Sequence, residues 1–218
     1  QTALFSAAAR IADAGMAPPA QSYQLMPGHR HSFSKVFSAL QIKPSEARWI
    51  NEVPDNPEPV DVVFFAGCGL TGMPHLFLEV VDILDSMKVN YVALAGGEIC
   101  CGATPILWGD LETSQKLGQN FISAISAFNP EKAVFACSGC HTMCIGSLPL
   151  VTSVPFESCE LTQFLVENLD KIPFTNSIDR QVTLHDSCSV ARLVLRGNCP
   201  CYATRDRKSG SANPAKRG

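Results

Sequence analysis

The sequence predicts an α/β fold, in which βαβ units build a parallel, Rossmann-like sheet with helices on both faces. The first indication is a series of short, continuous apolar runs, which are typical of strands covered on both faces. The second is that these runs alternate with stretches whose apolar residues recur every three or four positions, as on amphipathic helices. This alternation favours a parallel sheet with right-handed crossovers.

Residues 1–59 are expected to form a partly helical N-terminal lead and a linker. Residues 2–13 and 33–40 show short helical patterns, and Gly15-Met-Ala-Pro-Pro ends the first of them. Residues 54–59 contain three prolines, Pro54, Pro57 and Pro59. They mark a linker, because proline can neither continue a helix nor join a central strand.

The regular pattern begins after Pro59 and predicts a first α/β domain over residues 60–180. The expected strands are residues 62–66, 91–95, 133–136, 154–156 and 182–184. The fourth of these, residues 154–156, is a weaker apolar run that ends near Cys159. The expected helical faces consist of Met73, Leu76, Phe77, Val80, Val81, Leu84 and Met87, then in a longer helix Leu117, Phe121, Ile125 and Phe128, and finally Leu161, Phe164, Leu165 and Leu169.

The composition excludes several classes of protein. Of 218 residues, 46% are hydrophobic and 17% charged, which is enough apolar material for a real core. The net charge of −3 gives no electrostatic reason to expect binding to nucleic acid or to an anionic membrane surface. No apolar stretch reaches the length of a membrane span, and no signal-peptide pattern is present.

The chain contains ten cysteines, which is many for its length. A secreted disulfide scaffold would be small and would lack a core, so metal binding or redox chemistry in a reducing compartment is the better interpretation. Five of the cysteines follow the first three apolar runs: Cys68, Cys100, Cys101, Cys137 and Cys140. Parallel strands end at one edge of a sheet, so these five thiols are expected to gather in one pocket there.

Thiolates are soft ligands that favour zinc, copper(I) or iron–sulfur clusters. A structural zinc site usually takes two closely spaced cysteine pairs, whereas among these five cysteines only Cys137 and Cys140 are spaced in that way. The adjacent Cys100 and Cys101 need a sharp turn to converge, which Gly102 would permit. Five thiolates exceed the capacity of one tetrahedral ion and suit a cluster of several irons.

Two alternatives remain open from the residues alone. The first is a zinc-bound structural or interaction module. The second is a metal-free thiol oxidoreductase that uses Cys137 and Cys140 as a dithiol, with the first cysteine at a helix start. This second alternative leaves Cys68 and the adjacent pair unexplained.

The cysteine spacing resembles that of a known family. In this sequence 31 residues separate Cys68 from Cys100, 35 separate Cys101 from Cys137, and Cys137-x-x-Cys140 completes the pattern. This is similar to the cysteine-rich CCG domain found in the B and D components of heterodisulfide reductase and in related iron–sulfur oxidoreductases. The resemblance covers about residues 60–195.

The resemblance implies an oxidoreductase subunit that carries a [4Fe–4S] cluster, which in this family can be non-cubane. It implies that the five cysteines are the cluster ligands and that Gly102 supplies the turn. It further implies electron transfer or thiol/disulfide redox chemistry with ferredoxin-type, flavoprotein or membrane quinone/cytochrome subunits as partners. The expected location is the cytoplasm, where the protein could be peripheral to a membrane complex.

Relatives of this kind usually carry two such motifs in tandem. Here one repeat is complete, and a second is expected to start within residues 181–197, where His185-Asp-Ser-Cys188 resembles the opening of the motif and Arg192 follows. Cys188 would then belong to the second site, or would be a strand-end thiol near the first cluster. Residues 198–218 carry five basic side chains against one acidic, and we expect a disordered basic tail.

The resemblance therefore implies that the second motif is incomplete, and a first residue of Gln rather than Met suggests a fragment. Of the remaining cysteines, Cys144 and Cys159 are expected to be buried structural residues rather than ligands. Cys199 and Cys201 are expected to be free thiols. His141 could either tune the cluster through a hydrogen bond or simply bond to the backbone. Two explanations fit the glycines at positions 67, 69, 96 and 97 equally well. They could let the backbone approach a ligand closely, or they could simply form ordinary turns. These residues are Gly67, Gly69, Gly96 and Gly97.

Overall fold

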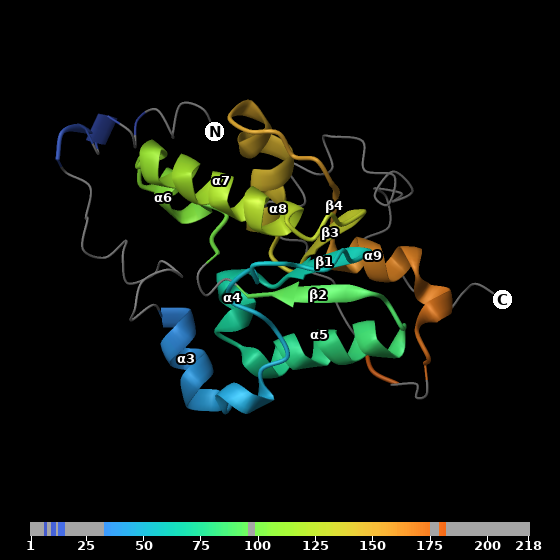
Figure 1. Cartoon of the computed structure of the whole chain (residues 1–218). Helices are drawn as coiled ribbons and strands as arrows, with labels where there is room; N and C mark the ends of the chain where they lie inside the picture. Colours follow the sequence, from blue (N-terminus) through green and yellow to red (C-terminus); the bar gives the residue numbers. More distant parts are fainter. Residues whose placement is uncertain are drawn as a thin grey trace. The chain divides into compact units, whose positions relative to one another are not determined.

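A computed structural model describes residues 7, 10, 11, 13–15, 33–95, 99–174 and 179–181 (Figure 1). The chain divides into one unit of residues 1–181 and a second of residues 182–218. None of the second unit belongs to the described residues, and the same holds for most of the helix predicted over residues 2–13. The predicted second repeat and basic tail, with His185, Cys188 and Arg192, therefore lie outside the described residues.

The first unit is built on a parallel sheet of four strands, which confirms the predicted α/β class. The strands are β1 (Val62–Phe65), β2 (Tyr91–Leu94), β3 (Lys132–Phe135) and β4 (Glu157–Glu160), in the order β2-β1-β3-β4. The connection from β2 to β3 passes over β1, so β1 and β3 are neighbours at the centre. In doubly wound sheets, the carboxyl ends of such neighbours form the crevice where ligands bind.

Helices cover both faces of this sheet. The helical segments are α3 (Phe33–Gln41), η1 (Pro44–Glu46), α4 (Gly67–Thr71), α5 (Pro74–Ser86), α6 (Ala103–Leu107), α7 (Leu111–Ser126), α8 (Ser138–Thr142), η2 (Met143–Ser147), η3 (Leu148–Leu150), α9 (Leu161–Glu167) and η4 (Leu169–Lys171). In Figure 1, α5 lies on one side of the sheet, and α6, α7 and α8 lie on the other. We call these the α5 face and the α7 face.

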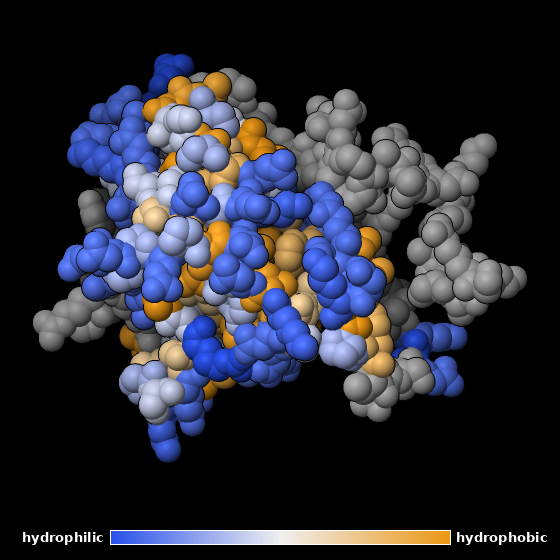
Figure 2. Space-filling model, turned by 45° about the vertical axis from the view of Figure 1, so that its right-hand side comes forward, coloured by the Kyte–Doolittle hydropathy of each residue, from blue (hydrophilic) through white to orange (hydrophobic). Residues whose placement is uncertain are grey.

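Each face has its own apolar core, because successive strand residues point to opposite sides. Val63 and Phe65 of β1 pack on the α7 face with Phe121 and Ile125, whereas Val62 and Phe64 pack on the α5 face. The α5-face core also contains Phe77, Val81, Leu84, Met87, Cys159 and Phe164. The predicted helical faces around Phe77 and Phe121 are thus confirmed, except that Met73 and Leu76 are exposed. In the view of Figure 2, hydrophilic residues cover much of the described surface, with hydrophobic residues between them.

Two predicted elements differ from the structure. The longer helix expected to end near Phe128 is divided into α6 and α7, because Gly109 takes a left-handed φ of 84° and Asp110 caps α7 by accepting a hydrogen bond from Thr113 N at 3.0 Å. The weak strand predicted at residues 154–156 is wrong. The strand is instead β4, which begins two residues after Pro155, a residue without an N–H for the sheet.

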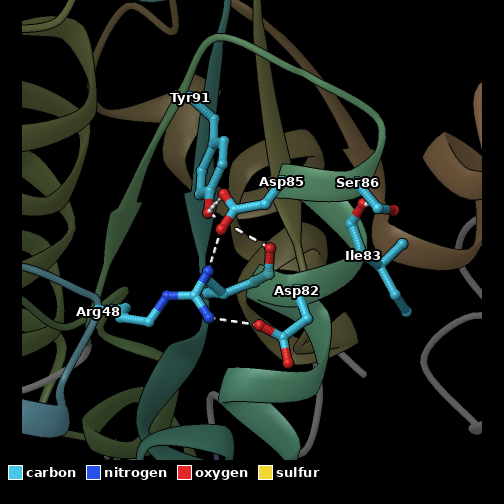
Figure 3. Close-up of polar contacts among 7 residues, drawn as sticks. Arg48, Asp82, Ile83, Asp85, Ser86 and Tyr91 are labelled. Carbon is cyan, nitrogen blue, oxygen red and sulfur yellow. Dashed lines mark hydrogen bonds and ion pairs between the residues drawn. The ribbon is translucent and has the colours of Figure 1, made fainter.

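The described part of the N-terminal lead packs along the β2 edge of the sheet, with Trp49 against the α5-face core and Ile50 and Val53 against the α7-face core. Its helix α3 confirms the pattern at residues 33–40, and residues 54–59 contain neither helix nor strand. Figure 3 shows that the Arg48 guanidinium of the lead forms ion pairs with Asp82 and Asp85 of α5. Tyr91 Oη donates a hydrogen bond to Asp85 Oδ1 at 2.6 Å. None of the helices in the described part of the chain is both long and apolar enough to cross a membrane.

Candidate cysteine-rich metal centre

The candidate site lies where three strands end. Cys68 follows β1 inside α4, Cys100 and Cys101 follow β2, and Cys137 and Cys140 follow β3 at the start of α8. The three strands are aligned in parallel register, with Val62 of β1 opposite both Tyr91 and Lys132. Their carboxyl ends therefore meet at one edge of the sheet.

The structure brings the five predicted thiols together. The thiols of Cys100, Cys101, Cys140 and Cys137 influence one another's pKa as neighbours, in that order. Cys68 completes the set, since its thiol interacts electrostatically with Cys101 and Cys137. We call these five side chains the thiol site. Their role as cluster ligands remains a prediction.

Within the thiol site, Cys101 is the best-stabilised anion. Hydrogen bonds from the thiols of Cys100 and Cys140 hold the pKa of Cys101 well below its ordinary value, although burial opposes this. The same hydrogen bonds raise the pKa of Cys100 and of Cys140, and burial raises both further. The thiolate is the form that binds metals, and Cys101 is the thiol of these three whose ionisation its neighbours favour.

Cys137 and Cys68 occupy the outer part of the site. A hydrogen bond from the Cys140 thiol, supported by the backbone of Cys140 and Gly139, lowers the pKa of Cys137 from 9.0 to about 6. Burial raises the pKa of Cys68, and negative charge on Cys101 and Cys137 raises it further. Cys137 and Cys68 are half-buried, whereas Cys100, Cys101 and Cys140 are 4–7% exposed.

Two glycines with left-handed backbones allow the thiols to converge. Gly67 has a φ of 71°, and a Cβ atom there would lie 2.9 Å from Cys137 Cβ and 3.4 Å from Cys140 Sγ. Gly102, which the sequence suggested as the turn after the cysteine pair, has a φ of 80° and directs its N–H to Cys100 Sγ at 3.4 Å. A side chain at Gly102 would also strike the backbone of Ser114 in α7.

The other described cysteines fall on opposite faces of the sheet. Cys144 is 2% exposed in the α7-face core, and burial together with the charge of Cys101 raises its pKa. Cys159 is 2% exposed in the α5-face core. Both locations agree with buried structural roles. The remaining cysteines and glycines of the sequence prediction, Cys188, Cys199, Cys201, Gly96 and Gly97, lie outside the described residues.

A buried histidine–carboxylate pair adjoins the thiol site, and the sequence revealed only half of it. His141 Nδ1 lies 3.1 Å from Glu160 Oε1, both side chains are almost fully buried, and the imidazole stacks on Phe135. The backbone N–H of His141 donates to Cys137 O at 3.1 Å. Glu160 ends a strand beside β3, and the misplacement of that strand in the sequence prediction hid its carboxylate.

The donor set fits an iron–sulfur cluster by its chemistry. It consists of five soft sulfur donors, three of them buried, with one backbone N–H directed at a sulfur. In the described part of the chain, no three Cys, His, Asp or Glu side chains are grouped around a point suitable for one metal ion.

Comparison with known proteins finds similarity to the same family. Residues 62–144 match the family model of the CCG cysteine-rich domain. The chain is 30% identical over 154 residues to the D component of dihydromethanophenazine:CoB–CoM heterodisulfide reductase from Methanosarcina barkeri. It is 25% identical over 145 residues to the B component of fumarate reductase (CoM/CoB) from Methanothermobacter marburgensis, and 25% over 167 residues to lactate utilization protein A of Bacillus pumilus. The resemblance inferred from the cysteine spacing is confirmed.

The coverage of these matches differs. The match to the Methanosarcina protein covers 66% of this chain but only 37% of that relative, so the chain spans little more than a third of its length. The corresponding shares are 66% and 28% for the fumarate reductase component, and 72% and 69% for the Bacillus protein. No solved structure matches the chain.

Proposed function

We propose that this chain, which carries a cysteine-rich CCG domain, is an iron–sulfur redox subunit of an oxidoreductase. The observation that carries the proposal is that five thiols follow three adjacent strand ends, where Cys137 and Cys140 pack against Gly67, the residue before Cys68. The relatives support the assignment, because two of those compared are named as reductase subunits.

The cofactor that we propose is a [4Fe–4S] cluster, with Cys68, Cys100, Cys101, Cys137 and Cys140 as its ligands. When bound, such a cluster supplies one-electron redox chemistry. Five ligands are one more than a cubane cluster needs, which favours a non-cubane form.

The chain's own residues determine how such a site is tuned. The Gly102 N–H at 3.4 Å from Cys100 Sγ is a hydrogen bond of the kind that shifts reduction potentials. The buried positions of Cys100, Cys101 and Cys140 keep water from three of the five sulfurs. The half-buried Cys68 and Cys137 leave one side of the site accessible.

The reaction that we propose is electron transfer coupled to disulfide or thiol chemistry. Reduction of one organic disulfide consumes two electrons and two protons and releases two thiols. The electrons would come from a partner redox protein, for which a ferredoxin-type, flavoprotein or membrane quinone/cytochrome subunit is our proposal. Cytoplasmic location remains a prediction.

The test is electron paramagnetic resonance of the full chain, reconstituted anaerobically with iron and sulfide. We expect a signal from a paramagnetic cluster that changes when an organic disulfide or thiol is added. The matched variant Cys68→Ser should lose the signal, because one of the three strand ends no longer supplies a ligand. A wild-type chain that binds zinc but neither iron nor sulfide would overturn the proposal in favour of a structural zinc module.

A further inference from the structure

The turn after the cysteine pair is held by α7 more closely than by the helix that it begins. Gly102 has a left-handed φ of 80° and is the N-cap residue of the short helix α6. Its carbonyl oxygen accepts a long hydrogen bond of 3.5 Å from Ile106 N in α6. The Ser114 hydroxyl of α7 donates to the same oxygen at 2.7 Å. The shorter and better hydrogen bond therefore comes from α7.

The face of α7 that receives this turn carries two small residues one helical turn apart. Ser114 and Gly118 are both buried. A Cβ atom at Gly118 would lie 3.6 Å from Cys101 O and 2.2 Å from Leu148 Cδ2. Since the turn and η3 already occupy this space, α7 can approach the backbone of the cysteine pair only with small residues on this face.

The same turn directs a backbone donor at one of the five thiols. The Gly102 N–H donates to Cys100 Sγ at 3.4 Å, and this contact is buried. Glycine alone does not select one backbone conformation, because it populates positive and negative φ about equally. The hydrogen bond from Ser114 fixes the carbonyl side of Gly102, and with it the conformation that points the N–H at the sulfur.

We propose that Ser114 is a positioning residue for the thiol site: its hydroxyl, acting through the Gly102 carbonyl, holds the Gly102 N–H against the Cys100 sulfur. This inference deepens the proposed function and rests on it for the effect on a cluster. Hydrogen bonds to the sulfurs help to set the reduction potential of an iron–sulfur cluster. An N–H directed at a ligand sulfur stabilises the reduced cluster, which is the more negative of its two states.

The experiment compares Ser114→Ala with Ser126→Ala in the full chain. Ser126 is the matched control, because it lies in the same helix and its hydroxyl is also buried, but this hydroxyl has no hydrogen-bond partner among the described residues. In the cluster-free, reduced chain labelled with ¹⁵N-glycine, hydrogen exchange of the Gly102 amide is measured by nuclear magnetic resonance. The Gly118 amide of α7 is the reference, since a general loss of stability would speed exchange at both.

We expect Ser114→Ala to speed exchange at Gly102 about tenfold relative to Gly118, equivalent to about 1.4 kcal/mol. Ser126→Ala should leave this ratio unchanged. An unchanged ratio in Ser114→Ala would overturn the inference.

A second measurement is a redox titration of the reconstituted chain, followed by electron paramagnetic resonance. Ser114→Ala should retain the iron and sulfide content of the wild type, but its reduction potential should shift to more negative values, because the loosened N–H stabilises the reduced state less. Ser126→Ala should have the potential of the wild type. Equal potentials in Ser114→Ala and the wild type would also overturn the inference.

The two proposals can fail separately. If the wild type takes up no iron, the proposed function fails, but exchange in the cluster-free chain still decides whether Ser114 positions the turn. If Ser114→Ala does not fold, as judged by circular dichroism, Ser114→Cys replaces it in the exchange measurement, because a thiol is a weaker donor than a hydroxyl. Exchange at Gly102 should then be faster by a smaller factor, and no change at all would overturn the inference.

Discussion

The two faces of the sheet are equally well buried but differ in chemistry. The α5 face is packed with side chains such as Phe64, Phe77 and Leu84, each fully buried, and among the described residues its core holds one cysteine, Cys159. The α7 face has a similar aromatic centre, but at its edge it also buries Cys101 and Cys140. The comparison shows that burial alone does not identify a functional cysteine. What distinguishes the α7 face is that its thiols have other thiols as neighbours.

The largest expected effect separates the two faces directly. Cys101→Ser removes the sulfur that two neighbouring thiols stabilise as an anion, and we expect bound iron to fall to near zero after reconstitution. Cys159→Ser, on the α5 face, should retain the full iron content while losing about 1–3 kcal/mol of stability, because a hydroxyl replaces a buried thiol. Iron assay and urea unfolding measure both. Equal loss of iron in the two variants would remove the distinction.

The next effect concerns the side of α4 that faces the thiols. Gly67→Ala places a methyl group 2.9 Å from Cys137 Cβ at a left-handed backbone position, so it should lower iron uptake severely and cost roughly 1–3 kcal/mol of stability. Gly69→Ala has open space and an ordinary helical backbone, and should take up iron as the wild type does. If Gly67→Ala binds iron normally, the close packing of Gly67 against the thiols is not required.

The titration of Cys137 gives a smaller, graded effect within the thiol site. Because its pKa is lowered from 9.0 to about 6, iodoacetamide labelling of the cluster-free chain should be almost constant above pH 7. Below pH 6 the rate should fall about tenfold per pH unit, as the thiolate is lost. Cys68, whose pKa is raised, should instead react faster up to and beyond pH 9.

The same shift has a consequence for stability. A lowered pKa in the folded chain stabilises the fold fully above the unfolded value of 9.0, less as the pH falls, and not at all below about 6. Cys137→Ser should therefore reduce the difference in unfolding free energy between pH 9 and pH 6. A Cys137 labelling rate that keeps rising between pH 7 and pH 9 would contradict the lowered pKa.

The smallest effect is expected on the outside of the α5 face. Arg48 pairs with Asp82 and Asp85 (Figure 3), but all three side chains are 41–67% exposed. Exposed ion pairs usually contribute less than about 1 kcal/mol. Arg48→Ala should lower the free energy of unfolding by no more than that, measured in urea, and should leave iron uptake unchanged. A loss of iron would show that the lead segment supports the thiol site.

The sequence was informative where strand ends determine the site. Cys68, Cys101 and Cys137 each follow a continuous apolar run, and parallel topology then brings them to one edge. The prediction that the thiols gather needed no knowledge of individual contacts.

The features that were missed depend on contacts distant in sequence. The strand β4 has the sequence Glu-Ser-Cys-Glu, which carries no apolar signal, and only its pairing with β3 makes it a strand. The pairing of Glu160 with His141 follows from that alignment, across 19 residues. The packing of Gly67 against Cys137 likewise joins the start of α4 to the start of α8, which are distant in sequence.

The central claim is that thiols from all three strand ends hold one iron–sulfur cluster. The most direct test is the iron and acid-labile sulfide content of the anaerobically reconstituted chain, measured for the wild type and for one variant per strand end: Cys68→Ser, Cys101→Ser and Cys137→Ser. We predict about four irons and four sulfides per wild-type chain, with both lost together in each variant. Full iron and sulfide in any of the three variants would contradict the claim.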